Sequence, residues 1–561
     1  MADEATNNVG RALEAIKIAR LEHPDDMLLE CFLQDAPEPQ EAAYYLLQQS
    51  YIEGNRYDFT PFLSDWKELI GSFVFEDPPR ELADSNIIAD VNMRDGGKCC
   101  ITGRDGSFFD PLVVAPILPM KRSIKASLHE LLTVFVGQDG SRDIISAKAI
   151  TCRDRWLVRK SAARASSQGY FRFTWIKDLE VSCPSIYILE FSLMKKQYYT
   201  TVNNIGGPTW PSILDMMAPV RRCRLSDHSS SGIELPDICS LQVLTRFAKA
   251  IRWAFVAREI AGKLARPTHR RPSSKFFYRI SDNVAMTLAK AWRLMPARLR
   301  TRAYRGLRVL GGRLYGPTCS SSVQQLPFGL YLKTLCGDHH QGLANEYGAL
   351  QLVREHTQVP VPCPLDLVSD HTTSYMLTSQ ISGHRLGMCL DALSDNELCD
   401  LVCDLREYLR ELRAIPKEIL PNYAITNAIG NACYDYRIIA SMNQEGERNR
   451  VFAGPFPTEE DFNKILEVAS LPNLSHRSGH NITFTHGDLN MRNILVSNGR
   501  LSGIVDWENS GWFPEYWDYT KAYYGTKIRR RWLRAVDEVF EDFGDFQKEL
   551  AIEEKLWEYC Y

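Results

Sequence analysis

Residues 482–508 of the chain read ITFTHGDLNMRNILVSNGRLSGIVDWE, and this stretch carries the strongest structural signal in the sequence. Two runs of β-forming residues, 494–496 and 501–505, lie on either side of Asn498 and Gly499. Asn-Gly pairs are favoured in two-residue hairpin turns, because both central residues of such a turn take positive φ angles. The stretch therefore predicts a β-hairpin that turns at Asn498-Gly499.

Polar side chains gather at the open end of this predicted hairpin. Counting outward from the turn places Asn493 opposite Ile504 and Asp506 opposite Met491, so both side chains emerge from the same end. Asp488 lies five residues before Asn493, in the loop that enters the hairpin. The pattern therefore predicts that two carboxylates and one amide converge.

These three side chains have the chemistry that phosphoryl transfer needs. Carboxylate and amide oxygens are ligands that Mg²⁺ accepts, usually beside phosphate oxygens and water. The reaction needs such an ion at the nucleotide phosphates and a base that orients the attacking hydroxyl. We assign Asn493 and Asp506 to the metal and Asp488 to the base, and we expect His486 to brace the loop through a hydrogen bond.

The motif resembles a known family. His486-Gly-Asp-Leu-Asn-Met-Arg-Asn493, followed by Ile504-Val-Asp-Trp-Glu508, resembles the catalytic loop and metal-binding motif of aminoglycoside phosphotransferases and their choline-kinase-like relatives. Residues 511–522 resemble the fungal members of that group. The resemblance covers residues 316–561. It implies an α+β, protein-kinase-like domain with a β-rich N-lobe and a helical C-lobe, which uses ATP and Mg²⁺.

The resemblance extends upstream of the catalytic loop. Residues 328–333 predict a strand that ends in Lys333, like the family's nucleotide-phosphate lysine. Glu346, on a predicted helix, would pair with Lys333 and hold the ammonium at the phosphates. Residues 375–383 resemble the strand and hinge between the lobes, so the adenine is expected near Met376 and Thr378.

Departures from protein kinases favour a small-molecule acceptor. Gly487 stands where protein kinases carry an arginine that pairs with a phosphorylated activation loop, Trp507-Glu508 replaces their Phe-Gly, and no Ala-Pro-Glu motif follows. Residues 315–323 form an atypical phosphate-covering loop, in which the hydroxyls of Ser320–Ser322 are candidate donors. Asp518 is expected to be the N-cap of a helix over 519–524.

The helical lobe is expected to form the acceptor site. Its acidic residues either attract a cationic acceptor or form a solvated helix face. They are Asp537, Glu538, Glu541, Asp542, Asp545 and Glu549.

Length and composition place this domain in a larger intracellular protein. A chain of 561 residues is too long for a single core, and its 45% hydrophobic and 24% charged residues are typical of globular proteins. The 15 cysteines show no disulfide or zinc pattern, and neither a secretory segment nor an apolar run of membrane-spanning length is present. We therefore expect a cytoplasmic location and no transmembrane segment.

The first 315 residues divide into three predicted parts. Residues 1–89 show helical periodicity, and residues 90–245 read as a mixed α+β region. Residues 246–315 predict a basic linker and helix, with the linker at 266–275 and the helix over 285–310.

The mixed region carries a second, shorter resemblance. Asp95-Gly-Gly-Lys-Cys-Cys-Ile-Thr-Gly103 and the run Val113–Pro119 resemble the opening of fungal HNH-type nuclease domains. Pro116 stands where that family has a histidine that serves metal-assisted hydrolysis, and proline can be neither a base nor a ligand. His129 is the only histidine between His23 and His228. We therefore interpret the region as a degenerate relative retained for folding or binding.

The sequence leaves three functions open. The leading one is a phosphotransferase with a small-molecule acceptor, and the second is a nucleotide-binding scaffold without turnover. The third is nucleic-acid binding through the N-terminal region and the segment 246–313, which holds eighteen Lys and Arg residues against Glu259 and Asp282. That segment is also compatible with a solvated tether, an anionic surface ligand or a nuclear-import signal.

Overall fold

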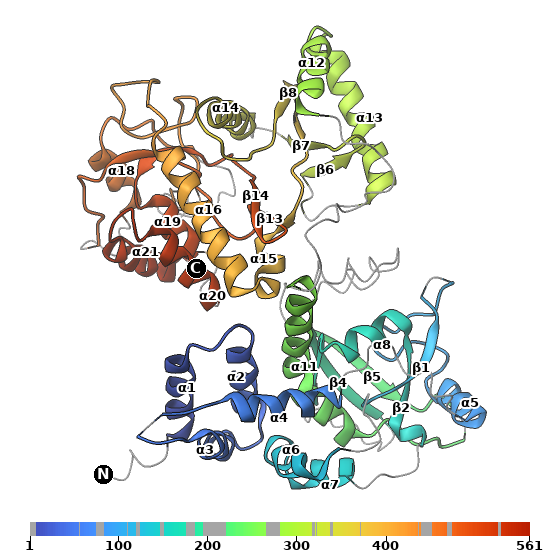
Figure 1. Cartoon of the computed structure of the whole chain (residues 1–561). Coiled ribbons are helices and arrows are strands. Elements are labelled where there is room, and N and C mark those ends of the chain that lie inside the picture. The colour runs from blue at the N-terminus through green and yellow to red at the C-terminus, as the bar shows by residue number, and fades with distance from the viewer. Residues whose placement is uncertain are drawn as a thin grey trace. The chain divides into compact units, whose positions relative to one another are not determined.

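The structure is a computed structural model, and it describes residues 7–54, 56–73, 84–108, 110–118, 124–145, 151–175, 186–193, 220–229, 231–264, 281–316, 320, 322–336, 340–370, 372–435, 437–438, 452–467, 474–524 and 529–560. The chain forms two compact units, Met1–Thr268 and His269–Tyr561 (Figure 1). Helices and antiparallel sheets occur in both units, which confirms the α+β class.

The first unit opens with helices that pack around an aromatic core. They are α1 (Asn8–Ala19), α2 (Asp25–Asp35), α3 (Pro39–Ser50), α4 (Thr60–Gly71) and α5 (Ser85–Arg94), followed later by α6 (His129–Val136) and α7 (Gln138–Ile145). Phe32, Trp66 and Phe135 lie in ring contact in this core. The long helix α11 (Ile238–Leu264) adds Phe247 to the same cluster.

The first unit also contains two small sheets. β1 (Leu112–Pro116) pairs with β2 (Arg155–Arg159), which leads into α8 (Lys160–Ser167). β3 (Phe171–Trp175), β4 (Ile186–Leu193) and β5 (Val220–Ser226) form a second antiparallel sheet. The mixed α+β pattern predicted for this region is therefore present.

The residues of the nuclease-like motif have structural contacts in the first unit. Arg94 and Asp95 form a buried ion pair with 2.7 Å between guanidinium and carboxylate. Pro116 ends β1 opposite Arg155, and a ring nitrogen of His129 lies 3.2 Å from the carbonyl oxygen of Ile124. In this unit, no three His, Cys, Asp or Glu side chains of the described residues lie close enough to share a metal ion. The degenerate nuclease-like interpretation stays a prediction.

The second unit begins with a β-rich lobe. β6 (Val323–Leu326), β7 (Leu330–Cys336), β9 (Thr373–Ser379) and β8 (Pro364–Ser369) form one antiparallel sheet in that order. α14 (His340–His356) lies between β7 and β8 in sequence and contacts β8 and β9. Two basic helices, α12 (Asp282–Arg293) and α13 (Ala297–Tyr315), pack on the same sheet through Ala285, Ala289 and Tyr304.

The single basic helix predicted over 285–310 is wrong. The chain breaks it between α12 and α13 at Leu294-Met-Pro296, because proline lacks the amide donor that a continuous helix needs. The expected linker 266–275 lies outside the described residues. Residues 246–264 belong to α11 and pack in the first unit, whereas 282–315 pack in the second. The finer division at 89/90, 245/246 and 315/316 stays a prediction.

The second lobe is mainly helical, as expected. Its helices are α15 (Leu386–Cys389), α16 (Asp395–Arg413), α18 (Glu459–Leu466), α19 (Trp517–Tyr524), α20 (Arg530–Phe540) and α21 (Gln547–Cys560). Its strands are β10 (His384–Arg385), β11 (Thr426–Asn427), β12 (Ile482–Thr485), β13 (Ile494–Ser497), β14 (Arg500–Ile504) and β15 (Gly511–Pro514). They form two three-stranded sheets, β10-β13-β14 and β11-β15-β12.

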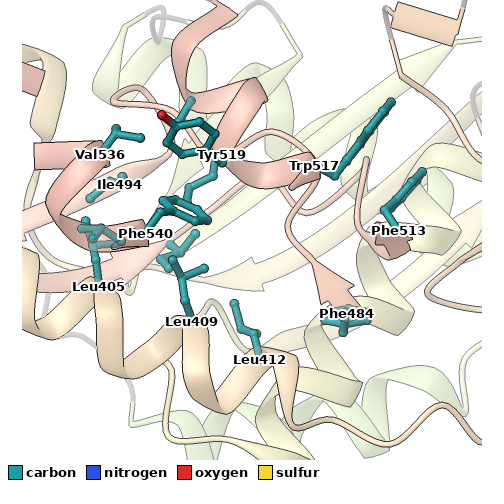
Figure 2. Packing of buried hydrophobic residues seen from close by; sticks show 14 of the residues in the cluster. Leu405, Leu409, Leu412, Phe484, Ile494, Phe513, Trp517, Tyr519, Val536 and Phe540 are labelled. Atoms are coloured by element: carbon teal, nitrogen blue, oxygen red, sulfur yellow. The ribbon is translucent and has the colours of Figure 1, made fainter. Parts of the chain in front are cut away.

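A large apolar core supports the helical lobe. Figure 2 shows Leu405, Leu409 and Leu412 of α16 at helical spacing, all directed toward the aromatic residues above them. Phe540 of α20 lies over these leucines, and Ile494 brings the start of β13 into the same cluster. The hairpin that carries the polar motif is therefore anchored to a rigid core. No helix in the described ranges has the length and hydropathy that a bilayer-spanning segment needs.

Candidate active site

Lys333 lies within β7, at the centre of a cluster of carboxylates. Its Nζ is 2.7 Å from Oε2 of Glu346, 2.6 Å from Oδ1 of Asp506 and 3.1 Å from Oε2 of Glu508. Glu346 comes from α14, and the two other acids follow β14. The strand was expected to end at Lys333, but it continues to Cys336. The predicted contact between Lys333 and Glu346 is present.

The electrostatics of this cluster favour the charged forms of Lys333 and Asp506. Burial acts to lower the pKa of Lys333, but the three carboxylates outweigh it and raise that pKa well above its usual value. Burial raises the pKa of Glu346 to about 7 although Lys333 opposes the shift. Burial also acts to raise the pKa of Asp506, but Lys333 prevails and the net shift of that pKa is downward. Lysine and Asp506 are therefore both ionised at neutral pH.

The cluster holds more negative than positive charge. One oxygen each from Glu346, Asp506 and Glu508 lies within 4.8 Å of the others, and within the described ranges this is the only such group of three His, Cys, Asp or Glu residues. Glu508 was missed by the sequence reasoning. No local pattern indicated it, because the chain leaves the extended conformation at Asp506 and turns at Glu508.

A buried asparagine sets the position of Glu508. Asn345, the neighbour of Glu346 on α14, donates both amide hydrogens, to the carbonyls of Glu508 and Ser510, each at 2.9 Å. Its own oxygen accepts the N–H of Ala428 at 2.8 Å. α14 therefore positions both acids, one directly and one through the neighbouring backbone.

The hairpin has the predicted turn but a different register. Asn498 and Gly499 take φ angles of 53° and 75°, as the turn requires. Val496 pairs with Leu501, but Leu495 then pairs with Gly503, so Ser502 is an extra residue that forms a β-bulge. The predicted pairing of Asn493 with Ile504 is therefore wrong by one residue.

The shifted register brings the two predicted metal ligands closer together along the ribbon. The carbonyl of Asn493 accepts the N–H of Val505 at 2.9 Å, directly before Asp506. Asp506 itself has a φ of 70°, a left-handed conformation that costs an ordinary residue free energy. Such strain is held by the surrounding structure and is typical of functional positions.

Asp488 and His486 are held by a local hydrogen-bond network. The amide of Asn493 donates to the carbonyl oxygen of Asp488 at 2.8 Å and to its carboxylate at 2.9 Å. The backbone N–H of Asp488 donates to Nδ1 of His486 at 3.1 Å, so Nε2 carries the ring proton and donates to the carbonyl of Val505 at 3.1 Å. His486 thus connects the loop to the strand that precedes Asp506.

Asp518 has a different position from the one expected. α19 begins at Trp517, so Asp518 is not its N-cap. Its carboxylate accepts the N–H groups of His486 at 3.0 Å and Gly487 at 2.8 Å. Gly487 has a φ of 76°, and a Cβ there would lie 2.2 Å from the carbonyl oxygen of Asn509. Glycine is therefore required in this loop by its backbone geometry.

Lys521, one turn after Asp518, places a buried ammonium beside Asp488. Its Nζ is 3.2 Å from Asp435 and 3.8 Å from Oδ1 of Asp488, and its side chain is only 3% exposed. Burial raises the pKa of Asp488, and the Lys521 ammonium is the largest influence against that rise. Lys521 was also missed, because the sequence gives no sign that α19 packs under the loop.

Met376 and Thr378 lie on the same face of the sheet as Lys333. Lys333 is directly opposite Met376, and Tyr331 is directly opposite Thr378. Directly paired residues point to the same side of a sheet, so these side chains lie on one face. The opposite face carries Leu332, which packs toward α13. Both predicted adenine-site residues are thus on the lysine face, and both are buried.

Other predicted elements have partners within the unit. The hydroxyls of Ser320 and Ser322 lie 2.8 Å apart, and residues 317–319 and 321 of the predicted phosphate-covering loop lie outside the described residues. In the acidic stretch, Glu549 is buried against Arg477, and Asp537 accepts the hydroxyl of Tyr519 at 2.9 Å. Both of these acids therefore hold the lobe together.

One family model matches the part of the chain that contains the site. Residues 333–550 match the model of the phosphotransferase enzyme family, APH. This stretch contains the predicted catalytic, metal-ligand and adenine-site residues, but not Ser320–Ser322 of the predicted phosphate-covering loop. The match supports a phosphotransferase activity for the second unit. No curated protein matches the chain.

Solved structures similar to this chain include three aminoglycoside phosphotransferases. APH(3'')-Id from Streptomyces rimosus, in complex with ADP and streptomycin, is 16% identical, with a TM-score of 0.32 over 46% of this chain and 98% of its own. The aminoglycoside-3'-phosphotransferase of type VIII is 17% identical, with a TM-score of 0.32 over 46% and 97%. APH(2")-IIa, in complex with gentamicin, is 14% identical, with a TM-score of 0.31 over 46% and 84%.

Proposed function

We propose that the second unit, whose residues 333–550 match the phosphotransferase enzyme family, moves the γ-phosphate of ATP to a hydroxyl of a small molecule with the aid of Mg²⁺. One observation carries the proposal: β7, α14 and the end of the hairpin bring Lys333, Glu346 and Asp506 within hydrogen-bond distance. These segments are far apart in sequence, and a solvated surface lysine would not collect three acids.

The donor set fits a magnesium ion. Asp506 and Asn493 supply the carboxylate and amide oxygens that we propose as ligands, and the surplus carboxylate of Glu508 adds negative charge beside them. When bound, the ion would neutralise charge on the nucleotide phosphates. Lys333 contacts Asp506 directly in this structure. We propose that the Lys333 ammonium turns from Asp506 to the phosphates when nucleotide enters, and that it keeps its ion pair with Glu346.

Asp488 is our candidate for the base. Asn493 holds one of its carboxylate oxygens, and Lys521 lies beside the other. In the proposed reaction the acceptor O–H proton moves to this carboxylate while the acceptor oxygen bonds to the γ-phosphorus. The bond from that phosphorus to the β,γ-bridging oxygen breaks, and ADP leaves. Most of the rate enhancement would come from positioning and charge neutralisation.

The path of the chain after Asp506 supports a small acceptor. β15 begins at Gly511, and α19 follows at Trp517. The structure describes all residues between Asp506 and α19. Even when counted from Asp506 to the end of α19 at Tyr524, this segment has 19 residues, which is too short for the long activation and docking loop of a protein kinase. Asp518 and Lys521 of α19 instead pack directly under the catalytic loop.

Release of ADP tests the proposal directly. Full-length protein with ATP and Mg²⁺ is assayed against a panel of aminoglycosides and hydroxylated metabolites, because these residues do not specify the acceptor. Asp488→Asn is expected to lower turnover by about 10³-fold and to leave ATP affinity nearly unchanged, since this residue acts on the acceptor hydroxyl.

A matched control is Asp400→Asn, an exposed carboxylate on α16. It should retain full turnover. Equal ADP release by the wild type and Asp488→Asn would contradict the proposal. Nucleotide binding without ADP release by the wild type, over the whole panel, would favour a scaffold instead.

A further inference from the structure

The two helices α12 and α13 form a strongly basic pair at one end of the second unit (Figure 1). We call residues 282–315 the basic hairpin. It contains one acid, Asp282, and eight basic residues: Lys290, Arg293, Arg298, Arg300, Arg302, Arg305, Arg308 and Arg313. Some of these have partners in the unit, since Arg300 pairs with the buried Asp366. Lys290, Arg298, Arg302 and Arg313 are exposed.

The outward faces of both helices also carry exposed apolar side chains. On α12 and the turn after it, Val284, Leu288 and Met295 are 51%, 56% and 42% exposed. The spacing of four residues between Val284 and Leu288 puts these two on one stripe of α12, beside the face where Ala285 and Ala289 pack on the sheet. Leu294, in the turn itself, is 87% exposed.

α13 mixes leucines with arginines on a single face. Leu299 and Leu310 are 46% and 44% exposed and lie eleven residues apart, which is three helical turns. Arg302 and Arg313 have the same spacing and lie beside them on the side away from Tyr304, the residue that anchors this helix to the sheet. The exposed face of α13 therefore presents guanidinium groups and apolar side chains next to each other.

We propose that the basic hairpin binds the surface of an anionic lipid bilayer. Apolar side chains flanked by arginines match the boundary between phosphate headgroups and acyl chains, where leucines enter the acyl region and arginines reach the phosphates. A phosphate polymer such as DNA or RNA would pair with the arginines but would leave Leu288, Leu294 and Leu299 without an apolar environment.

The sheet of the β-rich lobe separates this surface from the candidate active site. Leu332 and Leu377 face the basic hairpin, whereas Lys333 and Met376 occupy the other face of the same strands. A bilayer bound to the exposed side of α12 and α13 therefore leaves the lysine face accessible. Membrane binding and nucleotide binding are compatible in one molecule.

Vesicle flotation of the full-length chain tests the proposal. Binding is expected to vesicles of phosphatidylcholine with phosphatidylserine and not to phosphatidylcholine alone. Arg302→Gln with Arg313→Gln should lower the partition coefficient roughly 30-fold, since each basic residue near an anionic surface is worth about 1 kcal/mol. Leu288→Ser with Leu299→Ser should lower it by a similar factor. Ile18→Ser, which changes a 71% exposed residue of the first unit, should have no effect.

Other outcomes would overturn the inference. Absence of flotation with anionic vesicles at low salt is one. A second is double-stranded DNA binding that the arginine pair reduces and the leucine pair leaves intact, which indicates a nucleic-acid surface. A third is a change in hydrodynamic radius or thermal unfolding of the leucine variant without vesicles, because that shows the face covered by another part of this chain or by a second copy.

Discussion

Each unit contains a buried basic side chain in contact with carboxylate, and the two cases differ in charge balance. Arg94 in the first unit has one acid, Asp95, and its guanidinium also donates to the carbonyls of Cys152, Arg155 and Glu234 at 2.7, 2.8 and 3.0 Å. Asp95 in turn accepts the N–H of Leu157. All five donors of the arginine are used, and the pair is electrically neutral.

Lys333 in the second unit has three acids and no such balance. Glu346, Asp506 and Glu508 leave a surplus of negative charge, and the side chain of Asp506 is 44% exposed. A saturated neutral pair connects segments of a fold, whereas a surplus of carboxylate next to solvent is prepared for a further cation. The comparison indicates a structural role for Arg94 and a binding role for the Lys333 cluster.

The largest expected effect comes from removing charge from the unbalanced cluster. Asp506→Asn keeps the shape of the side chain but removes a proposed metal ligand, so turnover should fall on the order of 10³- to 10⁵-fold. Isothermal titration with Mg²⁺ and a non-hydrolysable ATP analogue should show the metal dependence of nucleotide binding largely lost. Unfolding should be little changed, and an unfolded variant would contradict the assignment.

Removal of Arg94 from the balanced pair should lower the stability of the first unit and leave turnover nearly unchanged. Arg94→Met leaves Asp95 and three carbonyls without their donor, and breaking a buried ion pair costs about 3–5 kcal/mol. Urea unfolding followed by the tryptophan fluorescence of the first unit should detect this loss. ADP release by the second unit should stay within about two-fold of the wild type. A large loss of turnover with an intact first unit would make Arg94 more than a structural residue.

An intermediate effect is expected at Lys521, whose charge is partly balanced. Lys521→Met removes the ammonium beside Asp488, and turnover should fall about 10²-fold with the KM for ATP unchanged. Lys521→Arg should restore part of that rate, because it keeps the charge. Lys464→Met, a change at a 69% exposed side chain, is the matched control. A rise in the KM for ATP with constant kcat would place Lys521 at the nucleotide instead.

How much the sequence predicted depended on how local each feature is. The turn at Asn498-Gly499 needs two positive φ angles and was predicted correctly, and the meeting of Lys333 with Glu346 followed from the resemblance. The bulge at Ser502 was not predicted, because a two-residue periodicity has no signal for an extra residue. The break at Pro296 did have a signal, since proline disfavours a continuous helix.

Contacts between distant segments were the least predictable part of the site. Asp518 and Lys521 lie about thirty residues after the loop they support, and only the packing of α19 brings them there. Nothing in their local pattern separates a helix-surface acid and base from buried partners of a catalytic loop. Glu508 is similar, because its pairing with Lys333 depends on how Asn345 fixes its backbone.

The smallest effect is expected in the acid range, at a second balanced cluster, in which the acids Asp435 and Glu553 lie beside the bases Arg437 and Lys521. Burial acts to raise the pKa of Asp435, but Arg437 and Lys521 outweigh it, so the net pKa lies below the ordinary value of 3.8. An acid with a lowered pKa in the folded state stabilises that state above its unfolded pKa, and this stability is lost as the pH falls through the folded pKa. The second unit should therefore lose stability below about pH 4.

Urea midpoints of the second unit, measured from pH 6 down to pH 2 by steps, would detect this loss. Asp435→Asn should be less stable at neutral pH, since it removes the acid that Arg437 and Lys521 share and leaves only Glu553 beside Arg437 and Asp488 beside Lys521. Its midpoint should vary less with pH below 4 than that of the wild type. Equal pH dependence of the two proteins would mean that Asp435 is not held ionised by its partners. Charge balance would then fail to separate structural clusters from binding clusters in this unit.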